Sequence, residues 1–307
     1  MKNIIISTLV FFAALASGLS QEARKELRIL IITDDDTFTG YMVDANEKEF
    51  LWRENAQSTL TRRQRLASCT VYFIHPEEYI EALELYKSRN YKDAAEKFAA
   101  CAKDYERFKE VPANPGVLAG FYEMECYRRL EDLETLMKLA ETFVPDTLLH
   151  EDQKLQYEIY KVFWDAVRTK GWARLDAICD DPKWRKRKMP GSLRAQIAYC
   201  QGLAREGIGK PIKALNSYNG AFVADFAASE EITRKSALNC LRIILAHEDV
   251  KTAMELYSTE DYSDDSNGAV LIQEATALLK LWDKVLGGGE KMPAQYKVFL
   301  KYPPKKG

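Results

Sequence analysis

The feature that most constrains this chain is a helical pattern that returns about every 40 residues. The positions that mark it hold mainly small or apolar side chains, at Ala94, Leu133, Ala173, Ala214 and Ala253. Four residues further on, one helical turn along the same face, stand Phe98, Met137, Ala177, Tyr218 and Tyr257. Each repeat predicts a hairpin of two amphipathic helices, and hairpins of this kind stack because none can bury its apolar face alone. We therefore expect residues 76–286 to form a mainly α solenoid of about five helical hairpins.

The clearest unit runs from Tyr199 to Asp225. Its small and aromatic packing positions are Gly202, Ala214, Tyr218 and Ala221. In these positions the chain resembles tetratricopeptide-repeat (TPR) proteins, although its period is longer than the roughly 34 residues usual in that family. The third unit, with Trp172 and Asp180, departs most from the pattern. The resemblance implies recognition of a peptide or protein partner along a concave face, without chemistry.

The sequence pattern of residues 21–75 is typical of a small β module. Leu27, Ile29 and Ile31 alternate with their neighbours, and polar turn residues at 34–36 and 44–46 separate further short apolar runs. Short strands at this spacing predict a meander or a small barrel. The run from Ile32 to Trp52 resembles the bent first strands of SH3-like or Sm-like barrels.

The first 20 residues read as a secretory signal. Lys2 supplies the positive start, an apolar core follows, and Gly18 and Ser20 are the small residues before a polar stretch. We expect cleavage after Ser20, which would place the protein in the bacterial periplasm or the secreted space. No later stretch approaches the roughly 20 apolar residues of a membrane helix, so no integral membrane segment is expected after cleavage.

Charge and cysteine usage narrow the function classes. The net charge of −2 gives no basic excess of the kind that nucleic-acid-binding proteins carry, so no nucleic-acid partner is expected. The six cysteines are widely spaced and form no CxxC pair. We predict that they are small buried residues at helix contacts, although their even number in an exported chain would permit disulfides.

Motifs that carry chemistry are scarce. The three histidines lie far apart, and the sequence contains no HExxH, GxSxG or phosphate-binding glycine loop. We therefore predict no catalytic residue and no cofactor. Residues Ser263 to Glu274 follow the spacing of a calcium loop, but a serine occupies the first ligand position. We expect no metal there, and a solvated loop in which Asn267 or Asp265 caps the following helix.

Two groups of residues are candidates for partner binding. The first is the basic run at 183–188, in which Lys183, Arg185 and Arg187 could grip an acidic partner or a membrane surface, or simply keep an inter-hairpin loop soluble. The second is an aromatic stripe on the helix expected at 153–168. Its members would either be buried between helices or anchor a partner in the concave groove, and they are Tyr157, Tyr160 and Trp164.

The C-terminal segment, residues 287–307, begins with three glycines that predict a flexible joint after a closing helix at Ala269–Leu286. From Gln295 to Tyr302 the apolar residues alternate with period two, which predicts a strand. This strand could pair with an open edge of the β module, or the tail could be disordered.

Taken together, these patterns favour a non-catalytic protein–protein interaction scaffold of the cell envelope or secreted space. The alternative is an envelope enzyme, or a subunit of one, that acts on cell-wall glycans. That alternative requires two facing carboxylates in a cleft, and the spacing of acidic residues singles out no such pair.

Overall fold

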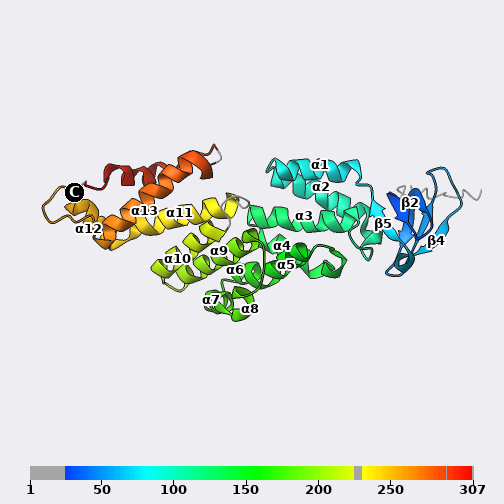
Figure 1. The fold of residues 1–307 in the computed structure, drawn as a ribbon, viewed down its shortest axis with the longest axis horizontal. Coiled ribbons are helices and arrows are strands. Elements are labelled where there is room, and N and C mark those ends of the chain that lie inside the picture. Colours follow the sequence, from blue (N-terminus) through cyan, green and yellow to red (C-terminus); the bar gives the residue numbers. More distant parts are fainter. Residues whose placement is uncertain (1–24, 225–229, 288, 306–307) are drawn as a thin grey trace, which may run out of the picture.

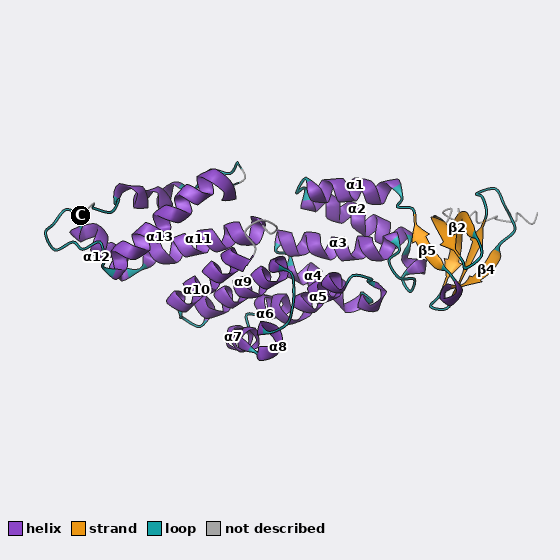
Figure 2. Cartoon of the chain, viewed as in Figure 1, coloured by secondary structure: helices purple, strands orange, loops and turns teal. Residues whose placement is uncertain are grey.

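The computed structural model describes residues 25–224, 230–287 and 289–305. The predicted signal segment at 1–20 lies outside these residues. Figures 1 and 2 show a five-stranded sheet at one end of the molecule, followed by packed helices along the rest of its length. The expected mainly α chain with a small N-terminal β module is confirmed. No helix in the described part of the chain combines the length and apolarity that crossing a membrane requires.

The sheet is antiparallel throughout, with the strand order β4-β3-β2-β1-β5. A single turn of 3₁₀ helix at Leu66–Ser68 precedes the last strand. Side chains that alternate along β1 point into the core, as the sequence predicts: Leu27, Ile29 and Ile31 are almost fully buried. The strands are β1 (Leu27–Ile32), β2 (Thr37–Ala45), β3 (Glu49–Arg53), β4 (Arg62–Arg65) and β5 (Thr70–Phe73).

Gly40 explains how closely β2 and β3 pack. A Cβ at this position would lie 2.5 Å from the Arg53 carbonyl oxygen and 2.6 Å from the Trp52 ring, so only glycine lets β3 approach β2 this closely. The buried face of the sheet shares one apolar core with the first helices, including Phe98 and Phe108. The β module is thus packed onto the helical part of the chain.

The helices pack in consecutive pairs, as hairpins do. The first four hairpins are α1 (Glu77–Lys87) with α2 (Tyr91–Asp104), α3 (Pro115–Leu130) with α4 (Leu133–Thr142), α5 (Glu151–Ile159) and α6 (Asp165–Arg168) with α7 (Trp172–Asp180), and α9 (Gly191–Gly207) with α10 (Pro211–Ala224). A π-helical turn at Tyr160–Trp164 joins α5 to α6, and the short α8 (Pro182–Arg185) precedes α9. The fifth hairpin is α11 (Glu230–Ala246) with α12 (Glu248–Leu256).

The same turn closes each of the first four hairpins. A residue with left-handed φ stands between the two helices, at Arg89 (67°), Glu131 (60°), Lys170 (54°) and Gly209 (73°). In every case its amide donates to the carbonyl three residues back, and the next amide donates to the carbonyl five residues back. This is the hydrogen-bond pattern that closes helix C-termini around a left-handed residue. The repeat is therefore present in the backbone as well as in the side-chain pattern.

The turns correct the register that the sequence pattern predicts. Ala173 and Ala177 are exposed, and Leu133 is only partly buried. The core positions that are equivalent between the five hairpins are held by buried residues. The first two of these residues are 42 positions apart, and each later interval is 39 positions: Ala94, Leu136, Leu175, Ala214 and Ala253. The predicted alignment is therefore wrong by three residues in the second unit and by two in the third.

The predicted packing of the best unit is confirmed. Gly202 of α9 lies against the ring of Tyr218 of α10, and a Cβ on Gly202 would stand 2.3 Å from that ring. Ala214 and Ala221 are fully buried beside it. All six cysteines are free, and all but Cys69 are buried, as expected for small packing residues.

After the fifth hairpin comes the predicted closing helix, formed by α13 (Asn267–Leu281) and a π-helical turn at Trp282–Leu286. Ser266 caps α13 by accepting from the Ala269 amide at 3.3 Å, so the cap expected at Asn267 or Asp265 is wrong. Asn267 instead donates to the Asp249 carboxylate. Within the described residues, no cluster of three or more metal-ligating side chains occurs.

The predicted C-terminal strand is wrong as well. Residues Ala294–Lys301 form a 3₁₀ helix that packs on α13 and α11, at the opposite end of the molecule from the β module (Figure 1). Tyr296 and Phe299 are buried there. A 3₁₀ helix has three residues per turn, so residues 296 and 299 lie on one side. The period-two alternation of Tyr296, Val298, Leu300 and Tyr302 is therefore not the pattern that decides how this segment folds.

Candidate functional site

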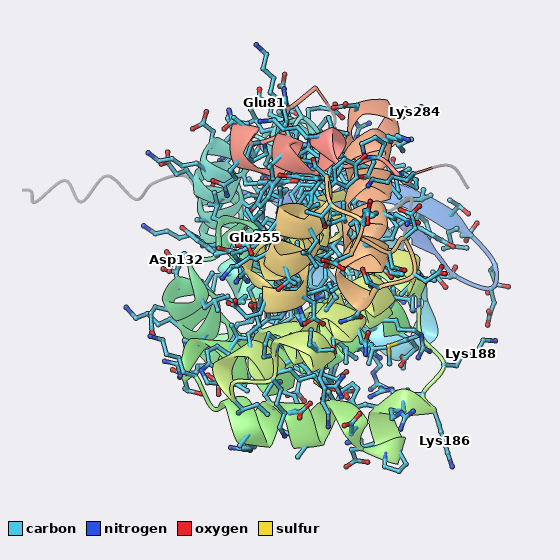
Figure 3. All side chains as sticks on the ribbon, turned by 90° about the vertical axis from the view of Figure 1, so that its left-hand side faces the viewer. Glu81, Asp132, Lys186, Lys188, Glu255 and Lys284 are labelled. Atoms are coloured by element: carbon cyan, nitrogen blue, oxygen red, sulfur yellow. The ribbon has the colours of Figure 1, made fainter. Side chains whose placement is uncertain are left out.

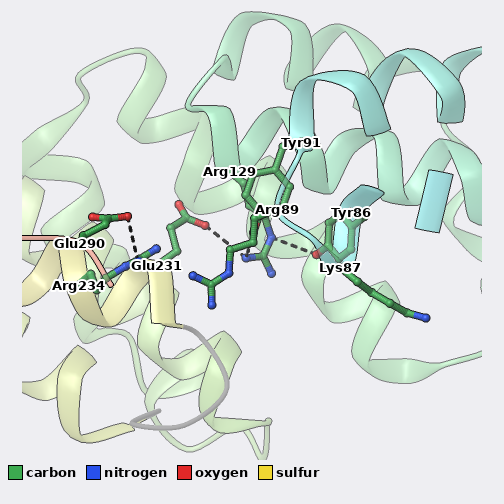
Figure 4. Close-up of a pocket in the computed structure, with 8 residues that line it drawn as sticks. All are labelled: Tyr86, Lys87, Arg89, Tyr91, Arg129, Glu231, Arg234 and Glu290. Carbon is green, nitrogen blue, oxygen red and sulfur yellow. Dashed lines mark hydrogen bonds and ion pairs between the residues drawn. The ribbon is translucent and has the colours of Figure 1, made fainter. Parts of the chain in front are cut away.

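A groove lies where the first hairpin faces the start of α11, with a volume of about 410 Å³ (Figure 4). In Figure 1, α1 and α13 stand on the same side of the molecule, over α3 and α11. The groove is lined by residues from α1, the α1–α2 turn, α2, α3, α11 and the segment after α13: Tyr86, Lys87, Arg89, Tyr91, Arg129, Glu231, Arg234 and Glu290. Its walls therefore come from segments about 200 residues apart in the chain.

The lining of this groove contains more basic than acidic side chains, although the chain as a whole carries a net charge of −2. Four of the lining residues are basic and two are acidic, and one of the basic side chains, Lys87, also pairs with Glu84 at 2.7 Å outside the lining. Both carboxylates are already engaged: Glu231 pairs with Arg129 at 3.5 Å, and Glu290 pairs with Arg234 at 3.1 Å. A concave surface with this balance attracts negatively charged groups.

Arg129 is held in place by two tyrosines. Its guanidinium donates to the hydroxyls of Tyr86 at 3.0 Å and Tyr91 at 3.2 Å. The same cation lies 5.2 Å from the centroid of each tyrosine ring, within cation–π range. Hydrogen bonds and ring contacts together fix the rotamer, so the charge at the floor of the groove is preorganised.

Beneath the groove lies a buried ion network centred on Glu125 of α3. Arg128, which is 1 % exposed, binds both carboxylate oxygens of Glu125, at 2.9 and 3.2 Å. The Tyr160 hydroxyl donates to the same carboxylate, and Arg128 also faces Glu231 at 3.9 Å. The network thus links α3 to α11 and to the third hairpin, and it supports the groove from below.

Several ionisable side chains in the groove and in the network beneath it have pKa values that are shifted by their surroundings. Burial opposes ionisation of Glu125, but the charge and hydrogen bonds of Arg128, together with the charge of Arg129 and the hydrogen bond from Tyr160, outweigh it and lower its pKa to about 2. Burial, and then the nearby Glu125 carboxylate, raise the pKa of Tyr86. Burial alone would lower the pKa of Arg129, yet Glu125 raises it overall. The shifted groups therefore move away from neutral pH, which favours fixed charges over proton transfer.

The aromatic stripe predicted as a binding surface is mostly buried in the core. Tyr160 is fully buried beside Glu125, and Trp164, 2 % exposed, donates to the Gln196 side-chain carbonyl at 3.0 Å. Tyr157 is partly exposed, and its hydroxyl donates to the Ala140 carbonyl at 2.7 Å. Burial between helices, the first of the two readings that the sequence left open, holds for Tyr160 and Trp164.

The basic run at 183–188 lies on a different surface from the groove. Trp184 is buried against Phe163, with ring centroids 4.8 Å apart, and it anchors the segment. Arg187 pairs with Glu158 at 2.5 Å and lies over the Trp184 ring. Lys183 also lies over that ring, whereas Arg185 lines a separate pocket beside α9. Figure 3 shows Lys186 and Lys188 projecting outward at the edge of the molecule.

Sequence reasoning missed the groove and its network. One signal was available: α3 is an apolar helix that nevertheless contains Glu123, Glu125, Arg128 and Arg129. Charges inside an apolar helix indicate buried ion pairs or a functional site, because an unpaired buried charge is costly. The contributions of Glu231 and Glu290 could not be recognised in this way.

Comparison of this chain with protein-family models, with curated proteins and with solved structures gives no match. The candidate site is therefore defined by its geometry alone.

Proposed function

We propose that this protein is a non-catalytic interaction scaffold, and that the groove between the first hairpin and α11 binds an acidic segment of a partner protein. The observation that carries the proposal is the preorganised positive charge of the groove, in which Arg129 is fixed by Tyr86 and Tyr91. Fixed complementary charge gives a binding site specificity and a fast association rate.

The architecture supports this reading. Stacked helical hairpins with a recurring closing turn resemble the helical repeats of TPR proteins, which present a concave surface to peptides. The strand order of the β module, with a 3₁₀ turn before its last strand, is consistent with an SH3-like barrel. The apolar start of the chain favours export, so we place the partner in the periplasm or outside the cell.

The groove does not support the enzyme alternative. Each carboxylate of the groove is paired with an arginine, Glu231 with Arg129 and Glu290 with Arg234. A glycan-cleaving pair would need one free carboxylate and one protonated carboxyl facing a bond between them.

The test is calorimetric titration of the full mature chain with a glutamate-rich decapeptide and with the same peptide in which glutamine replaces glutamate. We expect saturable binding of the acidic peptide only, weakening as salt is raised because exposed charges are screened. The double variant Lys87→Gln, Arg234→Gln removes two groove charges and should weaken binding about tenfold.

The matched control is Lys183→Gln, Arg185→Gln, which removes two charges from the basic run and should change affinity less than about twofold. Equal binding of the glutamine peptide would refute charge recognition. Loss of binding in the control variant, with the groove variant unaffected, would move the site to the basic run.

A further inference from the structure

A second cavity lies between α2, α3 and α4, on a different set of helix faces from the groove, with a volume of about 360 Å³. This volume is within the range of about 300 to 1,000 Å³ found for small-molecule sites. Its walls are mainly apolar, and they include Val117, Leu139, Phe143 and Val144. It is therefore a candidate site for a ligand with an apolar body.

Two glycines of α3, one turn apart, contribute to this space. Gly116 and Gly120 both line the cavity and present no side chain to it. A Cβ on Gly116 would stand 2.8 Å from the Tyr105 Cβ, so the backbone is closely packed there. A Cβ on Gly120 would meet only the Phe143 ring, at 3.5 Å, which is an ordinary contact. A larger side chain at 120 would therefore grow into the cavity.

One more turn along α3, Glu123 places a carboxyl group in the same cavity. The residue is 8 % exposed, and no hydrogen bond or ion pair to its side chain occurs among the described residues. Its oxygen atoms are not among the fully buried atoms that lack a partner, so they face the open space of the cavity. A buried carboxylate without a partner is unfavourable, and a position that breaks a packing rule without compensation within the chain is often functional. A cation bound in the cavity would supply that compensation.

We propose that this cavity binds a primary ammonium group carried on an apolar chain, with the Glu123 carboxylate as its counter-ion. The apolar walls hold the alkyl part, and the carboxylate at the α3 side accepts hydrogen bonds from the ammonium group. A free alkylamine and the lysine side chain of a partner segment share this chemistry. This site is separate from the groove, so its test is independent of the proposed function.

Other ionisable groups around the cavity are few. Tyr105, Glu106 and Lys109 also line it, and Cys126 and Tyr127 lie near Glu123 on α3. Burial, the largest effect in each case, raises the pKa of Tyr105, Cys126 and Tyr127. Burial also raises the pKa of Glu123 to about 7. Glu123 is thus the group whose shifted pKa lies near neutral pH.

The experiment is calorimetric titration of the full mature chain with n-hexylamine, with n-hexanol, and with the tripeptide acetyl-Gly-Lys-Gly-amide. We expect hexylamine to bind saturably, with a Kd on the order of 1 mM or tighter, and hexanol to bind at least tenfold more weakly. If only the ionised carboxyl binds, affinity should rise roughly 30-fold between pH 5.5 and pH 8. Binding of the tripeptide as well would identify lysine side chains as ligands, and its failure would restrict the site to free amines.

Two variants locate the site. Glu123→Gln should weaken hexylamine binding at least tenfold, and Gly120→Leu should do so by filling the cavity while Glu123 remains. The control Glu141→Gln removes an exposed carboxylate of α4 that does not line the cavity and should leave affinity within twofold. Hexanol binding as tightly as hexylamine, hexylamine affinity unchanged in Glu123→Gln, or no saturation at 10 mM would each overturn the proposal.

Discussion

Two carboxyl groups on α3, only two residues apart, show how strongly the surroundings decide the chemistry of a side chain. Glu125 is buried with Arg128 and Arg129 beside it, and its pKa falls to about 2. Glu123 is buried without a cation, and its pKa rises to about 7. Neighbouring positions on a helix point about 100° apart, so residues 123 and 125 face different neighbours. Sequence alone identifies both as charges in an apolar helix but cannot tell which one is paired.

This difference predicts a pH dependence of stability. The raised pKa of Glu123 means that the folded chain resists losing this proton. Ionisation of Glu123 therefore lowers the free energy of unfolding. This effect is absent below pH 4.5, grows between about pH 4.5 and pH 7, and is constant above pH 7. Glu123→Gln should therefore match the wild type near pH 4 and be more stable by about 2 kcal/mol at pH 8. Urea unfolding of the wild type and the variant at both pH values measures this difference in the free energy of unfolding. Equal stability at pH 8 would show that Glu123 is solvated or paired.

Gly202 allows a second prediction at this scale. Because a Cβ there would overlap the Tyr218 ring, Gly202→Ala should destabilise the chain by about 1 to 3 kcal/mol. Gly220, in the adjacent α10, provides the matched control, because a methyl group added there would meet no atom within 4 Å. Gly220→Ala should stabilise by about 0.5 to 1 kcal/mol through helix propensity. Thermal melts of the two variants must shift in opposite directions.

At the scale of elements, the hairpin turn is more regular than the sequence that forms it. Four turns share one hydrogen-bond pattern, yet only Gly209 has the residue that left-handed backbone favours. The sequence predicted the hairpins because amphipathic periodicity is a property of whole helices. It misplaced two registers because alanines such as Ala173 fit buried and exposed positions equally well, whereas Leu175 marks the core.

The turn at Lys170 gives a test of this motif. Lys170 is exposed and has a φ of 54°, which costs a residue with a Cβ about 1 to 2 kcal/mol. Lys170→Gly should remove that strain, and after the larger unfolded-state entropy of glycine the net gain should be about 0.5 kcal/mol. Lys170→Ala keeps the Cβ and should change stability little. Chemical denaturation of the pair measures the difference, and a destabilised glycine variant would contradict the assigned turn.

At the scale of the whole molecule, the candidate groove depends on contacts that no local pattern encodes. Arg129 and Glu231 meet across 102 residues of chain, and Glu290 arrives from beyond α13 (Figure 4). The class of fold and the order of its parts followed from periodicity, since local pattern decides element type. The groove could not be predicted from this local pattern, because its walls meet only through the rotation that accumulates along the stack between the first and the fifth hairpin.

The C-terminal segment provides the last prediction, on how the stack is closed. Phe299 is fully buried against α13 and α11, whereas its neighbour Leu300 is 50 % exposed. The segment is tied down further by the Trp282 indole, which donates to the Glu290 carbonyl at 2.9 Å, and by the Tyr257 hydroxyl, which donates to the Pro303 carbonyl at 2.7 Å. A docked segment of this kind covers apolar surface that the last helices would otherwise expose to water.

Phe299→Ala should therefore lower the stability of the α11–α13 region by about 3 to 5 kcal/mol, the usual result of emptying a buried aromatic site. Leu300→Ala, one residue away on the exposed side, should change it by less than about 0.5 kcal/mol. Hydrogen exchange locates the effect: amides of α13 should lose protection in the Phe299 variant, and those of the β module should not. Loss of protection in the β module would instead mean that the tail reaches the sheet. Equal behaviour of both variants would mean that the tail is undocked.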